Sequence, residues 1–105
     1  MRRGDRMISI HSLDVDGLFF IGIELELPEA TIFVVANEVG FIVSATFALQ
    51  LYSEAKQGKE VAATIGAVQS IDEFLQAPLK EVTKRARMHG WEAGMQCKDA
   101  LLKIA

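Results

Sequence analysis

The only cysteine of this chain, Cys97, stands in the segment GMQCKDALLK, where the pattern predicts the first turn of a helix. The partial positive charge of a helix N-terminus stabilises a thiolate, and cysteine enzymes use such positions. However, Ala100, Leu101 and Ile104 follow at helical spacing, which places the thiol on the apolar face of the helix. Apolar surroundings raise the pKa of a thiol. We therefore interpret Cys97 as structural and keep a reactive thiol as the alternative.

The other residues with acid, base or ligand chemistry are scattered along the chain. His11 falls in a predicted strand, and His89 at the C-terminus of a predicted helix, where it suits the helix dipole. This arrangement has no metal-ligand spacing, so we expect no metal and no cofactor. Glu24 and Glu26 share one face of a predicted strand and could act as an acid and base pair. A solvated strand end explains them more simply.

Length and charge limit the classes of partner. A chain of 105 residues corresponds to one domain over residues 1–105, with a flexible basic N-terminus at residues 1–6. The formal net charge is −3, whereas nucleic-acid binding relies on clustered Lys and Arg. The basic segment KEVTKRAR contains Glu81 and spreads around a predicted helix, so we interpret it as a solvated face. We expect no nucleic-acid partner.

Hydropathy also argues against a membrane protein. The longest apolar region, residues 18–51, is interrupted by four glutamates and Pro28, and no stretch reaches the roughly 20 apolar residues of a spanning helix. The basic start lacks an apolar run of signal-peptide length, and one cysteine cannot form an internal disulfide. We expect a cytoplasmic protein with no membrane contact.

The elements that must position these residues begin with strands. Apolar residues alternate with others in residues 7–13 and 18–27, and the β-rich segments TIFVVA and FIVS follow. Turn residues lie at 14–17 and 37–40, and Pro28 breaks the pattern between them. Residues 7–44 therefore read as an antiparallel meander of about four strands.

The second half of the sequence is mostly helical in pattern. A helix follows Ser44 and ends before Gly58, and the segment EVAATIGAV predicts a buried fifth strand that returns parallel to the fourth. Ser70 has capping-box spacing, Pro78 opens a helix that ends near His89, and the last helix begins near Cys97. The fold class is α+β: the meander, a helix, the fifth strand, and two or three C-terminal helices packed on one face of the sheet.

Residues 35–104 resemble the YunC-like family of small bacterial and archaeal proteins, which is catalogued as a domain of unknown function. The resemblance rests on the turn at residues 37–40, on SIDEFLQAPLKEVT at 70–83 and on GMQCKDALLK at 94–103. The family carries no established activity. The resemblance implies an N-terminal β-sheet region through which subunits form tetramers. In that family arginine is common at the positions of Thr64 and Gln69, and glycine at those of Ala67 and Cys97.

Two functional hypotheses follow. We favour a non-enzymatic oligomeric module that binds a small ligand or a protein partner. The alternative is an enzyme whose polar residues meet at a subunit interface, with Cys97 among them. Under either hypothesis the candidate ligand-binding residues are Asn37, Thr64, Gln69 and Cys97.

The strands carry apolar residues on both faces, more than three short helices can cover. We therefore expect a homo-oligomer built through the N-terminal strands. A tetramer is favoured by the resemblance, with a two-fold dimer as the fallback. The residues expected at this interface are Phe19, Phe20, Ile32, Phe33 and Phe41.

Overall fold

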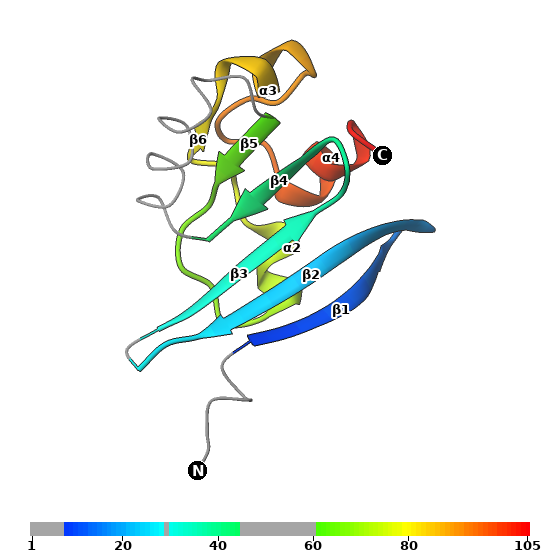
Figure 1. The fold of residues 1–105 in the computed structure, drawn as a ribbon. Helices are drawn as coiled ribbons and strands as arrows, with labels where there is room; N and C mark the ends of the chain where they lie inside the picture. Colours follow the sequence, from blue (N-terminus) through cyan, green and yellow to red (C-terminus); the bar gives the residue numbers. More distant parts are fainter. Residues whose placement is uncertain (1–7, 29, 45–60) are drawn as a thin grey trace.

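The computed structural model describes residues 8–28, 30–44 and 61–105 and has a mixed α+β fold, as predicted (Figure 1). The strands are β1 (Ile8–Val15), β2 (Leu18–Glu26), β3 (Thr31–Ala36), β4 (Gly40–Val43), β5 (Val61–Thr64) and β6 (Glu81–Val82), and the described helices are α2 (Ile71–Gln76), α3 (Lys84–Met88) and α4 (Cys97–Leu102). The six strands form one sheet in the order β1-β2-β3-β4-β5-β6. The helix predicted after Ser44 lies outside the described residues.

Strands β1 to β4 form the predicted antiparallel meander, and β5 runs parallel to β4. The turn between β1 and β2 is shorter than predicted. Only Asp16 and Gly17 lie between the paired residues Val15 and Leu18, and both have positive φ (53° and 86°). Two left-handed residues form the tight turn that matches the twist of a hairpin. The Asp14 carboxylate stabilises this turn by accepting from the Gly17 N–H at 2.8 Å.

The turn between β3 and β4 is fixed by Asn37. Its side-chain oxygen Oδ1 accepts hydrogen bonds from the N–H groups of Val39 (2.8 Å) and Gly40 (3.1 Å). The same type of local side-chain bond makes asparagine common in turns. The turn predicted at residues 37–40 is therefore confirmed.

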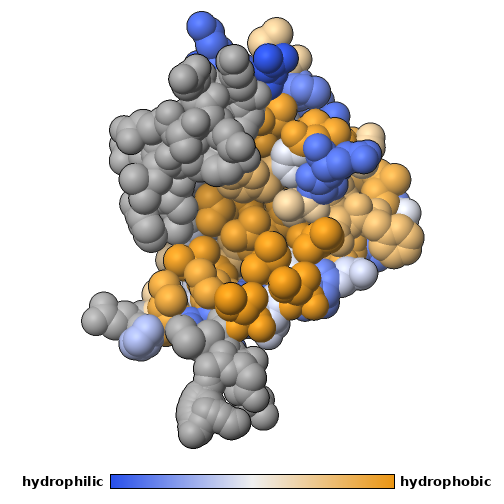
Figure 2. Space-filling view, viewed as in Figure 1, coloured by the Kyte–Doolittle hydropathy of each residue, from blue (hydrophilic) through white to orange (hydrophobic). Residues whose placement is uncertain are grey.

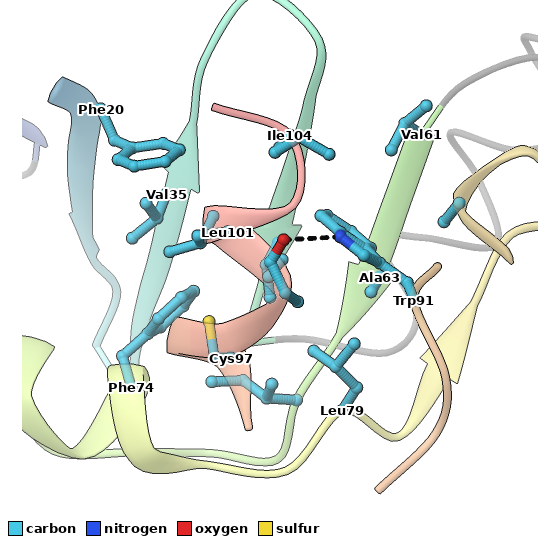
Figure 3. Packing of buried hydrophobic residues seen from close by; sticks show 14 of the residues in the cluster. Phe20, Val35, Val61, Ala63, Phe74, Leu79, Trp91, Cys97, Leu101 and Ile104 are labelled. Atoms are coloured by element: carbon cyan, nitrogen blue, oxygen red, sulfur yellow. Dashed lines mark hydrogen bonds between the residues drawn. The ribbon is translucent and has the colours of Figure 1, made fainter. Parts of the chain in front are cut away.

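The hydrophobic core lies between the sheet and helices α2 and α4, which pack behind it in the view of Figure 1. Phe74 of α2 and Leu101 of α4 are fully buried against sheet residues such as Val35 (Figure 3). Trp91 lies in the same core, and its Nε1–H donates to the Ala100 carbonyl oxygen at 2.7 Å. This bond satisfies the indole N–H, which would otherwise be buried without a partner.

The capping interaction predicted at Ser70 is confirmed with one change. Ser70 Oγ accepts from the Glu73 N–H at 3.2 Å, as the spacing requires. The Glu73 carboxylate reaches back to the N–H of Gln69 at 2.7 Å, whereas a standard capping box would use the N–H of Ser70. Helix α2 therefore begins where the sequence places it.

The helix predicted from Pro78 to His89 is wrong in its first half. The Leu79 N–H donates to the Met95 carbonyl at 2.9 Å. Residues 81–82 form β6, which pairs antiparallel with β5. Helix α3 begins only after Thr83, whose Oγ1 accepts from the Ala86 N–H at 3.2 Å. The apolar spacing of this segment suits a short strand as well as a helix, and pairing with β5 selects the strand.

The contact between the parallel strands requires glycine at position 40. A Cβ on Gly40 would clash with the backbone carbonyl oxygen of Val61, which cannot move without displacing β5. We predict that Gly40→Ala lowers the free energy of unfolding by about 1–3 kcal/mol. Gly66→Ala is the matched control, because its Cβ would meet only the flexible end of Lys80 at 3.3 Å. Urea unfolding of both variants measures the difference, and equal stabilities would contradict the prediction.

Candidate functional site

Cys97, the residue with the most reactive chemistry, is buried in the core. It occupies the first position of α4, its exposed fraction is 0%, and it lies near Phe74 (Figure 3). Burial in apolar surroundings raises the pKa of the Cys97 thiol far above its usual range. The thiol therefore stays protonated at neutral pH. The prediction that Cys97 lies on the buried, apolar face of its helix is confirmed.

Asn37 is occupied by structural bonds at both ends of its amide. Its oxygen caps the turn between β3 and β4, and its Nδ2 donates to the backbone carbonyl of Ile104 at 3.0 Å. This second bond ties the turn to the C-terminal segment, 67 positions away in the sequence. An amide used in this way positions the backbone and does not present itself to a ligand.

Thr64 and Gln69 have contrasting environments. Thr64 is fully buried, and its Oγ1 has no hydrogen-bond partner among the described residues. Gln69 is exposed and precedes α2. The structure does not bring the four candidate ligand residues into one site. Cys97 lies in the covered core, Asn37 is next to the start of β4, and Thr64 pairs with Val43 at its end.

The largest feature of the described surface is an apolar face of the sheet. Directly paired residues of neighbouring strands point to the same side, so the register assigns each side chain to a face. One set points away from the core formed with α2 and α4, and we call it the open face. Its large apolar members are Ile8, Ile10, Phe19, Ile21, Ile23, Leu25, Ile32, Val34 and Phe41. Figure 2 shows apolar side chains gathered on this side of the sheet.

Four residues dominate the exposed area of the open face. Phe19 is 73% exposed, Ile10 68%, Ile8 57% and Ile21 50%. At about 200 Å² for a fully exposed large side chain, these four amount to on the order of 500 Å² of apolar surface. This is near the upper end of the roughly 300–600 Å² that the largest patch of a monomer covers. The open face is thus large enough to be functional.

The structure divides the residues predicted at the oligomer interface between the two faces. Phe19, Ile32 and Phe41 belong to the open face, so they remain candidates. Phe20 and Phe33 are 2% and 3% exposed and belong to the chain's own core, which removes them from any surface contact. The reason is the two-residue period of a strand, because neighbours such as Phe19 and Phe20 must point to opposite faces.

Charge is nearly absent from the open face. Within the described parts of β1 to β4, Asp14 is its only ionisable residue, and it lies at the corner next to the turn. Glu24, Glu26 and His11 point to the other side of the sheet. Among the described residues, no three His, Cys, Asp or Glu side chains come close enough to hold a metal ion. The arrangement suits apolar contact and offers no acid and base pair.

Comparison with known proteins identifies the family. The model of DUF1805, a domain of unknown function, matches residues 48–104, which is more than half of the chain. The chain belongs to this family. The resemblance to YunC-like proteins is confirmed by a relative from Bacillus subtilis (strain 168), described as uncharacterized protein YunC. The two are 32% identical over 99 residues, covering 93% of this chain and 98% of the relative.

A solved structure shows the same fold for the whole DUF1805 chain. The crystal structure of a protein of unknown function, TA1206 from Thermoplasma acidophilum, matches with a TM-score of 0.83 and covers 100% of both chains. Its sequence identity is 16%, so the likeness concerns the fold alone. The described part of the chain contains no helix long and apolar enough to cross a membrane.

The protonated state of Cys97 predicts a pH dependence of stability. Burial raises the pKa of the Cys97 thiol in the folded state above the value of 9.0 of an exposed thiol, so alkaline pH ionises the thiol in the unfolded chain first. The buried, protonated thiol contributes fully to the unfolding free energy below pH 9, and this contribution is lost as the pH rises above 9. We predict that from pH 8 to pH 10 the wild type loses about 1 kcal/mol more unfolding free energy than Cys97→Ala. Parallel urea curves that keep a constant difference would contradict this.

The orphan hydroxyl of Thr64 predicts a stabilising substitution. Val has nearly the shape of Thr and removes a buried polar group that has no hydrogen-bond partner in the part of the chain that the structure describes. We predict that Thr64→Val raises the unfolding free energy by about 1 kcal/mol. Thr64→Ser, which keeps the hydroxyl and loses the methyl group, is the control and should lower it. A Thr64→Val protein less stable than wild type in urea would show that the hydroxyl has a bonding role.

Proposed function

We propose that this DUF1805 protein is a non-enzymatic module that associates with itself through the open face. One observation carries the proposal: an apolar surface on the order of 500 Å² that spans neighbouring strands and has one charge, at its corner. The largest apolar patch of a protein is often functional, because water contact with it is unfavourable.

A second copy of the chain fits this surface better than an unrelated partner. Two-fold packing places the same apolar patch on both sides, and no opposite charge is needed to complement it. The two patches together bury roughly 1,000 Å² from the four most exposed residues alone, which is close to the lower limit of about 1,200 Å² for a stable interface. The partly buried members, such as Ile23 and Leu25, add to this area.

Packing of two open faces also has a familiar geometry. Sheets that face each other pack about 10 Å apart with interdigitating side chains, and they need alternating apolar residues on both inner faces. The open face has this alternation on β1, β2 and β3. The proposed dimer is therefore a sandwich whose outer layers are the helices of each copy.

An enzymatic role has little support. The Cys97 thiol is buried and protonated, and the Asn37 amide is occupied by structural bonds. The Thr64 hydroxyl is buried without a hydrogen-bond partner among the described residues, and Gln69 is exposed, so a small-ligand role would rest on these two side chains. We place the module in the cytoplasm, where a chain with one buried, reduced cysteine is stable.

A charge on the open face tests the proposal. Ile21→Glu would bury an unpaired carboxylate in the proposed interface, so we predict that the dissociation constant rises at least about 100-fold. Met88→Glu is the matched control, because Met88 is 75% exposed on α3 and outside the open face. Light scattering coupled to size-exclusion chromatography gives the mass of each protein at micromolar concentration. A wild type that runs as one subunit would overturn the proposal, as would an Ile21→Glu protein that keeps the wild-type mass.

A further inference from the structure

The short helix α3 forms a basic surface that is separate from the open face. Ala86 is the buried residue of α3 and points into the core, so side chains on the other sides of the helix point outward. These exposed side chains are Lys84, Arg85, Arg87 and Met88, and we call them the α3 surface. In Figure 1 helix α3 lies at the β5 and β6 end of the sheet, away from β1.

The structure concentrates positive charge here more than the sequence pattern predicts. A helix over residues 78–89 would carry Glu81 among the basic residues and spread their charge around its circumference. Instead, Glu81 lies on β6 and pairs with Thr64. Because Ala63 and Val82, the next pair along, point to the core side, Glu81 points to the opposite side of the sheet. The basic residues that follow it are left together on α3.

Ion pairs do not neutralise the α3 surface. Within the described residues the one ion pair joins Lys98 to Asp16, and neither belongs to this surface. Lys103 adds a further positive charge beside it. Its side chain lies next to Gly90, just after the end of α3, where a Cβ would be 3.2 Å from the Lys103 Cδ. A chain with a formal net charge of −3 therefore presents a local surface of the opposite sign.

We propose that the α3 surface binds an acidic segment of a protein partner, in which an apolar side chain accompanies the carboxylates. Arg85 and Arg87 suit carboxylates, because a guanidinium can donate two parallel hydrogen bonds to one carboxylate. Met88 is 75% exposed and lies between Lys84 and Arg85 around the helix, where it offers a flexible apolar contact among the charges. Arg and Met are both enriched in protein interfaces.

Other anions fit this surface less well. Small-molecule sites are concave, whereas a helix with outward side chains is convex and holds a small anion from one side only. A long nucleic acid would extend beyond α3 and meet a chain whose net charge is −3. Helix α3 spans five residues, or about 7.5 Å, which is close to one Debye length in physiological salt. A short acidic segment stays within the range of these charges.

A labelled peptide of glutamates with one central leucine tests the proposal by fluorescence anisotropy. We expect the wild type to bind this peptide, and to bind an all-glutamate peptide of the same length more weakly, because that peptide has no apolar contact for Met88. The same peptide with glutamine in place of glutamate should not bind. Raising the salt concentration should weaken binding of the acidic peptides, because salt screens exposed charges.

Matched variants locate the binding surface. Arg85→Glu should raise the dissociation constant at least about tenfold. Lys80→Glu makes the same change of net charge at an exposed residue beside Gly66, outside the α3 surface, and should bind as wild type. Met88→Ala should weaken binding of the peptide with leucine and leave that of the all-glutamate peptide unchanged. Circular dichroism verifies that each variant is folded, and Arg87→Gln repeats the test without reversing a charge.

Three outcomes would overturn this inference. They are no binding of the acidic peptide by the wild type, an equal loss in Arg85→Glu and Lys80→Glu, and tighter binding of single-stranded DNA or phosphatidylglycerol vesicles at the same salt concentration. The inference does not rest on the proposed function, because the α3 surface and the open face are separate. Ile21→Glu should therefore bind the peptide as wild type does, whether or not the wild type associates with itself.

Discussion

The fold depends on a mismatch between the sheet and its cover. Six strands send half of their side chains to each face, and the described helices α2 and α4 pack against one face only. On β1 to β3 both sets include large apolar side chains, so covering one face leaves apolar side chains of the other in contact with water. The core, the open face and the proposed assembly all follow from this constraint.

The covered side is held by interactions that join distant parts of the chain. The Trp91 Nε1–H bonds to Ala100 within the core, and the Asn37 amide bonds to Ile104 across the end of the sheet. These bonds hold α4 against β3 and β4, so Cys97 at its start stays buried. Two of the candidate residues, Asn37 and Cys97, are therefore used to build the covered side.

Much of the architecture could be predicted because it depends on local interactions. Turn residues such as Asn37 bond to their own neighbours, Ser70 caps its own helix, and the phase of α4 follows from residues one turn apart. Residues 78–83 could not be predicted in the same way. Their apolar spacing fits a helix or a strand, and the N–H groups of Leu79 and Lys80 find partners in Met95 and Thr64, far away in the sequence.

The sequence by itself determined that β1 to β3 carry apolar residues on both faces and that one helical layer cannot cover both faces. It also determined that Cys97 lies on the apolar side of its helix. Only the tertiary structure decided which face of the sheet is covered. The two-residue alternation of a strand is compatible with either face being covered. In the structure the helices pack on the face that carries Phe20 and Phe33. That choice leaves Phe19 and Ile21 exposed to form a surface, because packing against α2 and α4 acts between segments that local pattern does not relate.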